Sequence, residues 1–454
     1  MTGIFRAYDI RGVYPSEINE EICFKIAVAY ANCMKNAKKV VIGRDARISS
    51  PALKDAIIHG LKAAGKDVID IGIVPTPVLY YSMFNLKTKA GLMITASHLP
   101  SEHNGIKLER EHAMGLTGES GIYQIEDLIN KSKIRLSKKH GHVTHKNVNQ
   151  DYINHVSKII KLKKKLKIVI DSGNGVCGDI AEKVFRKLNC KVISINKKPD
   201  GRFPNHIADP HEYAKYHSMD DLMKRVKKEK ADLGIAYDGD GDRVGFVDEC
   251  GQRIQEEHYI MLFAKQALLS AKGRKIILDI RASDKLIAGV KEDGGIVKLT
   301  RAGHSYIEMR ALKEHAIFAG ETSGHLFFPY CYYPYDDGIF GSLKFAEIVA
   351  SVENISELVK PLPKLNISPE IRIKYADDQK FKFIKDLKKH LRAKNMNFLD
   401  IDGVRIRFKN GWALIRASNT AAQVTMRFEG NTRKDLADVK RKVRLILKKF
   451  KVKI

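Results

Sequence analysis

Short runs of apolar residues, each followed by small or acidic residues, recur along the chain and predict buried strands. Three of them resemble one another: residues 40–45 (VVIGRD), 168–171 (IVID) and 276–279 (IILD), each preceded by lysine and ending in aspartate. Each leads into a segment compatible with a helix, and this alternation is typical of α/β proteins. The aspartates lie 126 and 108 residues apart (171 − 45 and 279 − 171), which predicts three related units of about that size.

Each of these units has a second apolar run that ends in an unusual loop. The loops are Thr95–Pro100, which contains Ser97, then Ala236–Arg243 and Gly320–His325. A proline-rich linker at 361–369 precedes a tail with a mixed pattern and a fourth conspicuous loop, Arg416–Thr420. We therefore expect an α/β protein with three related mixed α/β domains and a C-terminal α+β domain. The expected boundaries are 1–148, 149–254, 255–366 and 367–454.

Composition narrows the possible classes of protein. No apolar run approaches the roughly 20 residues of a membrane helix, and the N-terminus lacks the pattern of a secretory signal. The six cysteines include no closely spaced pair of the kind used in zinc sites or redox motifs. We therefore expect a cytoplasmic protein that does not bind a membrane.

The net charge of +27, from 80 basic and 53 acidic side chains, raises the alternative of a nucleic-acid-binding protein. The excess lies in helix-like stretches at 158–167, 224–230 and 440–453. In the last of these, Val439, Val443, Ile446 and Phe450 recur at helical spacing, so the lysines form the solvated face of a packed helix. No basic stretch is interleaved with aromatic residues, as single-strand binders require. We expect no nucleic-acid partner, although the positive field favours an anionic substrate.

The second loop carries the clearest chemistry, because Asp238, Asp240 and Asp242 alternate with glycines. Three carboxylates so close together repel one another unless a cation joins them, and Mg²⁺ suits a site with few protein carboxylates. A solvated acidic turn does not explain this alternation after a strand. A calcium EF-hand would place Glu249 at position 12, but position 6 is Arg243 where that loop needs glycine, and the flanks read as strands.

A glycine-rich segment at 173–178 (GNGVCG) follows a strand and precedes a helix, as in dinucleotide-binding proteins. The acidic residue expected after the next strand is missing, and Asn196, Lys197 and Lys198 stand there instead. Lysines could accept the phosphate of NADP, so an NADP-dependent oxidoreductase remains an alternative. A tight turn without a ligand is the favoured interpretation.

Six motifs occur in an order that resembles the α-D-phosphohexomutase family, most closely its bacterial phosphomannomutase/phosphoglucomutase branch. They span nearly the whole chain and are Phe5–Gly12, Gly43–Pro51, Thr95–Pro100, Ala236–Arg243, Gly320–His325 and Arg416–Thr420. The resemblance implies four domains around a central cleft, with one loop from each. It implies interconversion of hexose 6-phosphate and hexose 1-phosphate, of mannose or glucose, through a phosphoserine and a hexose 1,6-bisphosphate intermediate. Phosphoglucosamine mutase is the nearest alternative.

The resemblance also assigns roles to single residues. Ser97 carries the phosphoryl group and, with Asp238, Asp240 and Asp242, binds one Mg²⁺. Arg11, Arg243 and Lys107 are the cations beside it, with Lys107 a candidate general base, and His304 matches a second proton-handling position. The substrate-binding residues would be Tyr8, Glu321, Ser323, His325, Arg416, Ser418, Asn419 and Thr420. Two simpler interpretations stay open: His304 as a structural turn residue and Glu321 as a helix cap.

Three departures from the family pattern touch the site. Leu99 stands where asparagine is usual, Ala302 where threonine is common, and Ala422 where a proline usually follows the phosphate loop. None removes a charged group. We expect an active monomer that binds sugar phosphates, with hexose 1,6-bisphosphate as its activator. The last domain, tethered by the linker with few crossing contacts, is expected to move as a lid.

Overall fold

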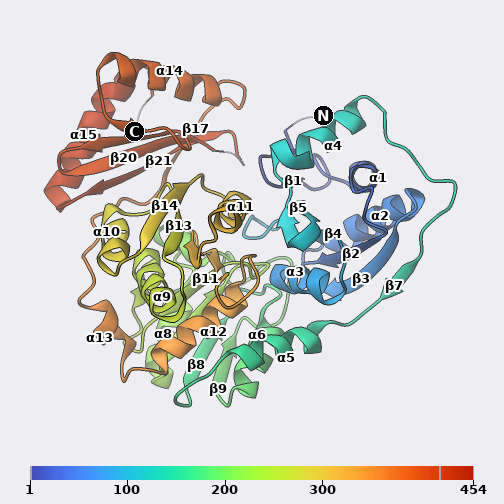
Figure 1. Cartoon of the computed structure of the whole chain (residues 1–454), viewed down its shortest axis with the longest axis horizontal. Coiled ribbons are helices and arrows are strands. Elements are labelled where there is room, and N and C mark those ends of the chain that lie inside the picture. The colour runs from blue at the N-terminus through green and yellow to red at the C-terminus, as the bar shows by residue number, and fades with distance from the viewer. Residues whose placement is uncertain (1–2, 419–420, 453–454) are drawn as a thin grey trace.

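The computed structural model describes residues 3–418 and 421–452, so Asn419 and Thr420 lie outside the described residues. Four sheets follow one another along the chain, and each belongs to one domain (Figure 1). The first domain lies opposite the fourth, and the second and third lie together between and below them (Figure 1).

The first sheet has the order β1-β5-β4-β2-β3-β7, with β6 added beside β5. Its strands are β1 (Ile10–Val13), β2 (Lys39–Arg44), β3 (Asp67–Ile73), β4 (Ala90–Ile94), β5 (His103–Arg110), β6 (Met114–Gly115) and β7 (Val143–His145). Its helices are α1 (Glu20–Cys33), α2 (Ser50–Ala63), α3 (Thr76–Asn85) and α4 (Tyr123–Asn130). The predicted strand β2 pairs in parallel with β3 and β4, and β5 then runs antiparallel to β4.

The second and third sheets repeat this arrangement. The second has the order β12-β11-β10-β8-β9 and the third β14-β13-β15-β16. Their strands are β8 (Lys167–Asp171), β9 (Lys191–Ile195), β10 (Leu233–Tyr237), β11 (Val244–Val247), β12 (Arg253–Ile254), β13 (Lys275–Asp279), β14 (Ile296–Thr300), β15 (Phe318–Gly320) and β16 (Leu326–Phe327). In both, the predicted strand lies between two parallel neighbours, and an antiparallel strand follows.

Helices cover these two sheets. Those of the second domain are α5 (Asn149–Ile159), α6 (Gly178–Lys187), α7 (Tyr213–Tyr216) and α8 (Asp220–Glu229). Those of the third are α9 (Glu256–Ser270), α10 (Asp284–Glu292), α11 (His304–Glu314), α12 (Gly338–Val349) and α13 (Ile355–Val359). The three related mixed α/β domains are thus confirmed. Each candidate site loop is the turn from a parallel strand into its antiparallel neighbour: β4 to β5, β10 to β11 and β15 to β16.

The fourth domain has an antiparallel sheet of order β17-β21-β20-β19-β18. Its strands are β17 (Ile371–Lys374), β18 (Phe398–Leu399), β19 (Val404–Phe408), β20 (Gly411–Ala417) and β21 (Gln423–Gly430). The helices α14 (Lys380–Ala393) and α15 (Arg433–Lys448) pack on it through a shared apolar core, which confirms the α+β domain. Val439 and Val443 of α15 are buried in that core, as the helical spacing predicts.

One hydrophobic core runs through the first three domains. An aromatic segment after β16 joins them: the ring of Tyr333 stacks on Phe84 of α3, with centroids 4.3 Å apart, and on His155 of α5, 5.4 Å apart. Burying aromatic rings from three domains against one another stabilises their relative placement. Among the described residues, no helix combines the length and apolar character needed to cross a bilayer.

The fourth domain is fastened to the third by buried side chains, so the expectation of few contacts across the linker is wrong. The guanidinium of Arg405 is 1% exposed and donates to the carbonyl oxygens of Ile280 and Ala282, both at 2.9 Å. It also pairs with Asp284 at 2.7 Å and lies 3.9 Å from the ring centroid of Trp412. Any movement of the fourth domain must pivot at this joint or break it.

Candidate active site

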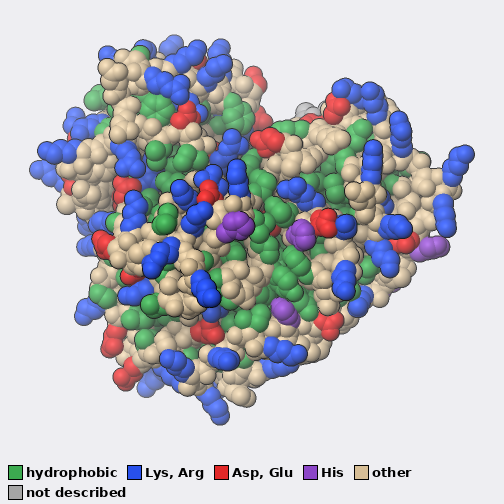
Figure 2. Space-filling model, in the orientation of Figure 1, with side chains coloured by type: hydrophobic (Ala, Val, Ile, Leu, Met, Phe, Trp, Pro, Cys, Tyr) green, Lys and Arg blue, Asp and Glu red, His purple; other side chains and the backbone are tan. Residues whose placement is uncertain are grey.

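A central cleft of about 860 Å³ is lined by residues from all four domains, as the resemblance implies. Ser97, Arg243, Glu321 and Arg416 each reach it from a different domain. Figure 2 shows the surface hollowed between the lobes, with basic side chains scattered over the visible face and not gathered in one stripe. That distribution fits a solvated basic surface better than a nucleic-acid site.

Ser97 lies on the loop after β4, with its side chain pointing toward the aspartate loop of the second domain. Its Oγ donates to Asp238 Oδ2 at 2.8 Å and lies 3.1 Å from His98 Nδ1. Its backbone NH donates to Thr95 Oγ1 at 2.8 Å, and its φ of 51° is in the left-handed region. That conformation is unfavourable for a serine, so the surrounding structure must hold it there.

The aspartate loop gathers three buried carboxylates. Oxygens of Asp238, Asp240 and Asp242 lie within 4.8 Å of one another. Burial and the charge of Asp242 raise the pKa of Asp238 to about 7. Burial acts in the same direction on Asp242, but Lys107 and other cations hold the pKa of Asp242 well below its usual range. Asp240 Oδ1 and Asp242 Oδ1 are buried without a hydrogen-bond partner, so the donor set fits a hard divalent cation.

The cations predicted beside Ser97 are present. Lys107 Nζ of β5 pairs with Asp242 and lies 3.3 Å from Asp240 Oδ2, and these charges raise the pKa of Lys107 against the effect of burial. Arg243 Nε donates to Asp238 Oδ2 at 2.8 Å, so this side chain turns inward. Arg11 lines the cleft and pairs with a neighbouring carboxylate, Asp9, at 2.6 Å.

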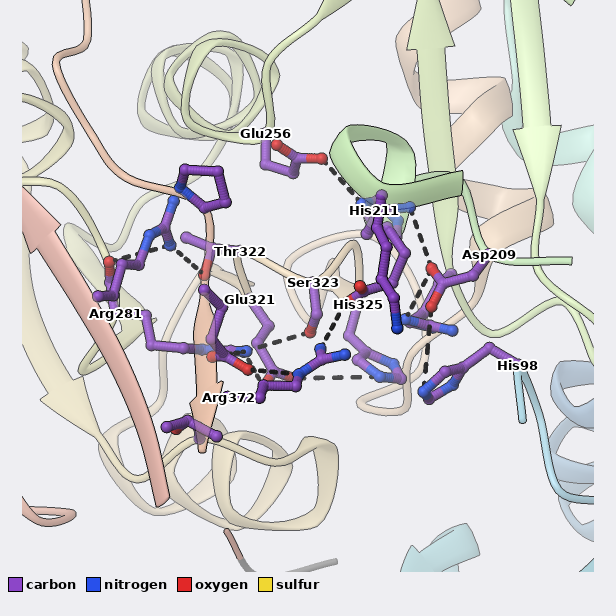
Figure 3. A pocket seen from close by; sticks show the side chains of 18 of the residues that line it. His98, Asp209, His211, Glu256, Arg281, Glu321, Thr322, Ser323, His325 and Arg372 are labelled. Carbon is purple, nitrogen blue, oxygen red and sulfur yellow. Dashed lines mark hydrogen bonds and ion pairs between the residues drawn. The ribbon is translucent and has the colours of Figure 1, made fainter. Parts of the chain in front are cut away.

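The candidate sugar-binding loop of the third domain, Gly320–His325, is held by a side chain that sequence reasoning missed, Arg281 (Figure 3). Its Nη2 donates to Glu321 and, at 3.2 Å, to Ser323 Oγ. Glu321 Oε1 also accepts from the backbone NH of Gly303, just before α11, while residues 321–325 form a turn between β15 and β16 and begin no helix that Glu321 could cap. Glu321 Oε2 is buried without a hydrogen-bond partner, which leaves it able to accept a hydrogen bond from a ligand.

Two histidines of the third domain face the same space in opposite charge states. Burial lowers the pKa of His304, the first residue of α11, to about 3, and its Nε2 has no hydrogen-bond partner. His325 is only partly buried, and although burial lowers its pKa, the charges of Asp242 and Asp336 raise it to about 9. The ring of Tyr8 lies edge-on to His304, with centroids 5.6 Å apart.

The fourth domain contributes Arg416 and Ser418 to the cleft. Arg416 Nη2 pairs with Asp402 at 2.8 Å, and Ser418 Oγ accepts from the backbone NH of Ala421 at 3.2 Å. The predicted Asn419 and Thr420 lie outside the described residues. The described part of this loop therefore offers one guanidinium and one hydroxyl.

Asp209 and His211 of the second domain also line the cleft and were not found from the sequence (Figure 3). Asp209 is buried, yet Arg243 and the two histidines His98 and His211 lower its pKa to about 2. His211 Nδ1 lies 2.9 Å from Glu256 Oε1. They lie between β9 and α7, Asp209 just before and His211 within a short 3-10 helix (Pro210–Glu212), where no hydrophobic pattern marks a strand end. Arg281, in contrast, could have been found, because it follows the repeated aspartate Asp279 by two residues.

The glycine-rich segment after β8 serves loop packing. A Cβ on Gly175 would come within 2.6 Å of the carbonyl oxygen of Gly239, and the NH of Val176 donates to that same oxygen at 3.2 Å. The segment thus supports the aspartate loop from behind. The backbone of that loop fills the space beside these glycines, which removes the main argument for a dinucleotide there.

Comparison with protein families gives four matches in order along the chain. They are phosphoglucomutase/phosphomannomutase alpha/beta/alpha domain I at residues 2–135, domain II at 150–251, domain III at 255–365 and the C-terminal domain at 370–446.

Individual proteins resemble the chain over almost its full length. A phosphomannomutase/phosphoglucomutase of Pseudomonas syringae pv. tomato is 38% identical over 438 residues, covering 95% of this chain and 92% of that protein. A phosphoglucomutase of Neisseria meningitidis is 34% identical over 454 residues, covering 98% and 96%. A crystal structure of a phosphoglucomutase/phosphomannomutase family protein from Burkholderia thailandensis superimposes with a TM-score of 0.90 at 33% identity, covering 99% and 98%.

Proposed function

Because this chain belongs to the phosphoglucomutase/phosphomannomutase family, we propose that it interconverts hexose 6-phosphates and hexose 1-phosphates with Ser97 as phosphoryl carrier. The sugar would be mannose, glucose or both, because these differ only in the direction of the hydroxyl at C2. The observation that carries the assignment of Ser97 is its position. Its Oγ donates a hydrogen bond to Asp238, in a cleft that residues of all four domains line.

The proposed reaction consists of two phosphoryl transfers. In the first, the bond between phosphorus and Ser97 Oγ breaks, a bond to a sugar hydroxyl oxygen forms, and the hydroxyl proton passes to a base. The product is a hexose 1,6-bisphosphate, which turns within the cleft. In the second, the other phosphate returns to Ser97, and the sugar oxygen that leaves takes up a proton. Such transfers depend on positioning and charge neutralisation more than on covalent help from the protein.

Ser97 Oγ, Asp238, Asp240 and Asp242 would together hold one Mg²⁺. When bound, the ion supplies positive charge at the transferring phosphoryl group. Arg243 and Arg11 add fixed cations on the protein side, since both line the cleft near Ser97. The unpartnered oxygens of Asp240 and Asp242 support this assignment.

The two proton-handling candidates stand in different states. Lys107 is held protonated by the charges of Asp240 and Asp242. It can act as a base only when another cation neutralises those carboxylates. Burial keeps His304 neutral by lowering its pKa to about 3, and its Nε2, which has no hydrogen-bond partner, is able to accept a hydrogen bond from a sugar hydroxyl. We assign Lys107, the candidate general base, and His304 as the two proton-handling groups of the transfers.

The remaining loops would hold the sugar and its second phosphate. Glu321 and Ser323 bind vicinal hydroxyls, and the charged His325 lies beside them. Arg416 and Ser418, with Asn419 and Thr420, form the cradle for the phosphate that does not react. An anchored phosphate and a common sugar site allow either end of the bisphosphate to face Ser97. Tyr8 closes the wall beside His304.

One chain supplies every wall of the cleft, so we expect a monomer. All six cysteines are free in the structure, which suits the reducing environment of the cytoplasm. Sugar phosphates are the expected partners, with hexose 1,6-bisphosphate as activator.

The test combines intact mass with a comparison of substrates. The purified protein should carry a phosphate adduct on some molecules, and Ser97→Ala should lose both the adduct and turnover. Ser101→Ala, an exposed serine on the same loop, is the matched control and should keep both. Wild-type turnover by Ser97→Ala at saturating hexose 1,6-bisphosphate would overturn the assignment. Assays of mannose, glucose and glucosamine 1-phosphates side by side decide between the sugar alternatives.

A further inference from the structure

The guanidinium of Arg47 lies behind the Ser97 loop, fully buried, at the start of the turn between β2 and α2. Its Nη2 donates to the carbonyl oxygens of Ser97 at 2.9 Å and Leu99 at 2.6 Å. Its Nη1 donates to the carbonyl oxygens of Pro100 at 2.6 Å and His103 at 3.0 Å. One side chain thus binds three carbonyl oxygens of the loop that carries Ser97 and one of the first residue of β5, which follows that loop.

The fifth NH of the same guanidinium fixes its orientation. Nε donates to Asp45 Oδ2 at 3.1 Å, and the other oxygen of Asp45 accepts from the backbone NH of Arg47 at 3.0 Å. A guanidinium has five NH donors in a rigid fork, and all five are used here. A lysine has a single nitrogen and cannot reach four carbonyls and a carboxylate in these directions.

Residues of the second domain pack against Arg47 and against the loop that carries Ser97. The ring centroid of Phe203 lies 5.0 Å from Arg47 Cζ, within the range of a cation–π contact. A Cβ on Gly239 would lie 2.4 Å from the carbonyl oxygen of Ser97. That carbonyl is therefore confined between the guanidinium of Arg47 and the backbone of the aspartate loop.

The third domain contains the same arrangement of aspartate and arginine, and there the arginine contacts a side chain of the candidate site. Arg281 follows Asp279 as Arg47 follows Asp45, and its NH and Nε donate to Asp279 at 2.7 and 3.0 Å. From there Arg281 reaches across to the sugar loop at Glu321. In both domains an arginine two residues after the repeated aspartate reaches the site loop that follows the neighbouring parallel strand.

We propose that Arg47 is the positioning residue for the phosphoryl carrier. It holds the loop in the shape that gives Ser97 its left-handed backbone and aims Oγ at the metal-binding aspartates. This rests on the proposed function, in which Ser97 carries the phosphoryl group. Arg47 itself bonds the backbone carbonyl of Ser97 and does not act on the reacting atoms. Its loss should slow both transfers while leaving the sugar and phosphate contacts in the other domains intact.

The experiment compares Arg47→Lys with Arg405→Lys. Arg405 is the matched control, because it is equally buried and donates to two carbonyls and a carboxylate, but at the joint between the third and fourth domains. Each protein is loaded with hexose 1,6-bisphosphate, its phosphate content is measured by intact mass, and transfer to hexose 6-phosphate is followed in a single turnover. Thermal unfolding of each variant is recorded in parallel.

We expect both variants to lose stability, but only Arg47→Lys to transfer slowly, by about 100-fold, because small misplacements of a reacting group cost about that much. Its KM should stay within about twofold of wild type, and Arg405→Lys should keep its transfer rate within about threefold. Wild-type transfer by Arg47→Lys, or equal slowing in both variants, would overturn the proposal. If Arg47→Lys does not fold, Phe203→Leu decides in its place: transfer slowed several-fold supports the proposal, and wild-type transfer overturns it. Absence of phosphate from Ser97 in the loaded wild-type protein would instead refute the proposed function.

Discussion

Replacing Glu109 by glutamine should change how the stability of the protein depends on pH. Glu109 lies on β5 two residues after Lys107, is 1% exposed, and points to the same side of the strand. A second buried carboxyl, Glu308 of α11, accepts from the backbone NH of Gly115 at 3.3 Å, and a Cβ on Gly115 would lie 3.6 Å from Glu109 Oε2. Two carboxyls from different domains thus meet beside Gly115.

Burial raises the pKa of Glu109 from 4.5 to about 8, an effect that the charge of Lys107 only partly offsets. The folded protein therefore keeps a proton on Glu109 between pH 4.5 and 8, whereas the unfolded chain loses it. Because the native state binds more protons in this window, stability falls as pH rises. Relative to low pH, where both states hold the proton, the free energy of unfolding falls by about 3 kcal/mol at pH 7 and by less than about 1 kcal/mol at pH 5, at about 1.36 kcal/mol per pKa unit.

The measurement is the free energy of unfolding by urea at pH 5, 6, 7 and 8 for wild type and Glu109→Gln. The glutamine cannot ionise, so the variant should gain about 2 kcal/mol relative to wild type between pH 5 and pH 7. The amide adds a constant offset that does not affect this slope. Glu111→Gln, an exposed glutamate that lies 3.1 Å from Lys89, is the control and should follow wild type. Parallel curves for wild type and Glu109→Gln would refute the reasoning.

Three further substitutions test the site. Asp240→Asn removes one negative ligand and should weaken Mg²⁺ binding in calorimetry and slow turnover by about 100-fold; full activity after exhaustive chelation would contradict the metal assignment. Glu321→Ala should cost about 2–4 kcal/mol in kcat/KM with Mg²⁺ affinity unchanged, whereas an equal loss of metal binding would indicate a structural role for its loop. Arg416→Ala should raise KM for hexose phosphates while Ser97 still accepts phosphate. Hydrogen exchange in residues 410–430 should slow when substrate is added, and identical exchange would contradict closure of the fourth domain.

Much of the fold could be predicted from the sequence because strand patterns are local. The three aspartate-ending runs became β2, β8 and β13, each in the same place within its sheet. The alternating aspartates were recognisable as a candidate metal site for a similar reason, since residues two apart on one loop necessarily stay close. The departures at Leu99, Ala302 and Ala422 left every charged group of the expected site in place.

The tertiary structure decided which distant residues meet. Nothing local showed that Arg405 would be buried against the third domain, because a guanidinium on a strand is equally compatible with solvent. Likewise, Asp209 and Arg243 are 34 residues apart (243 − 209), and only packing brings their charges within 3.4 Å.

Charge states depended on the tertiary structure most of all. His304 and His325 are the same residue type in neighbouring segments, yet one is held neutral and the other charged. The sequence alone determined the domains, the order of the loops and the kinds of side chain that each loop offers. Burial and neighbouring charges arise only when the chain closes on itself, and they determined which of those side chains hold a proton and which way the hydroxyl of Ser97 points.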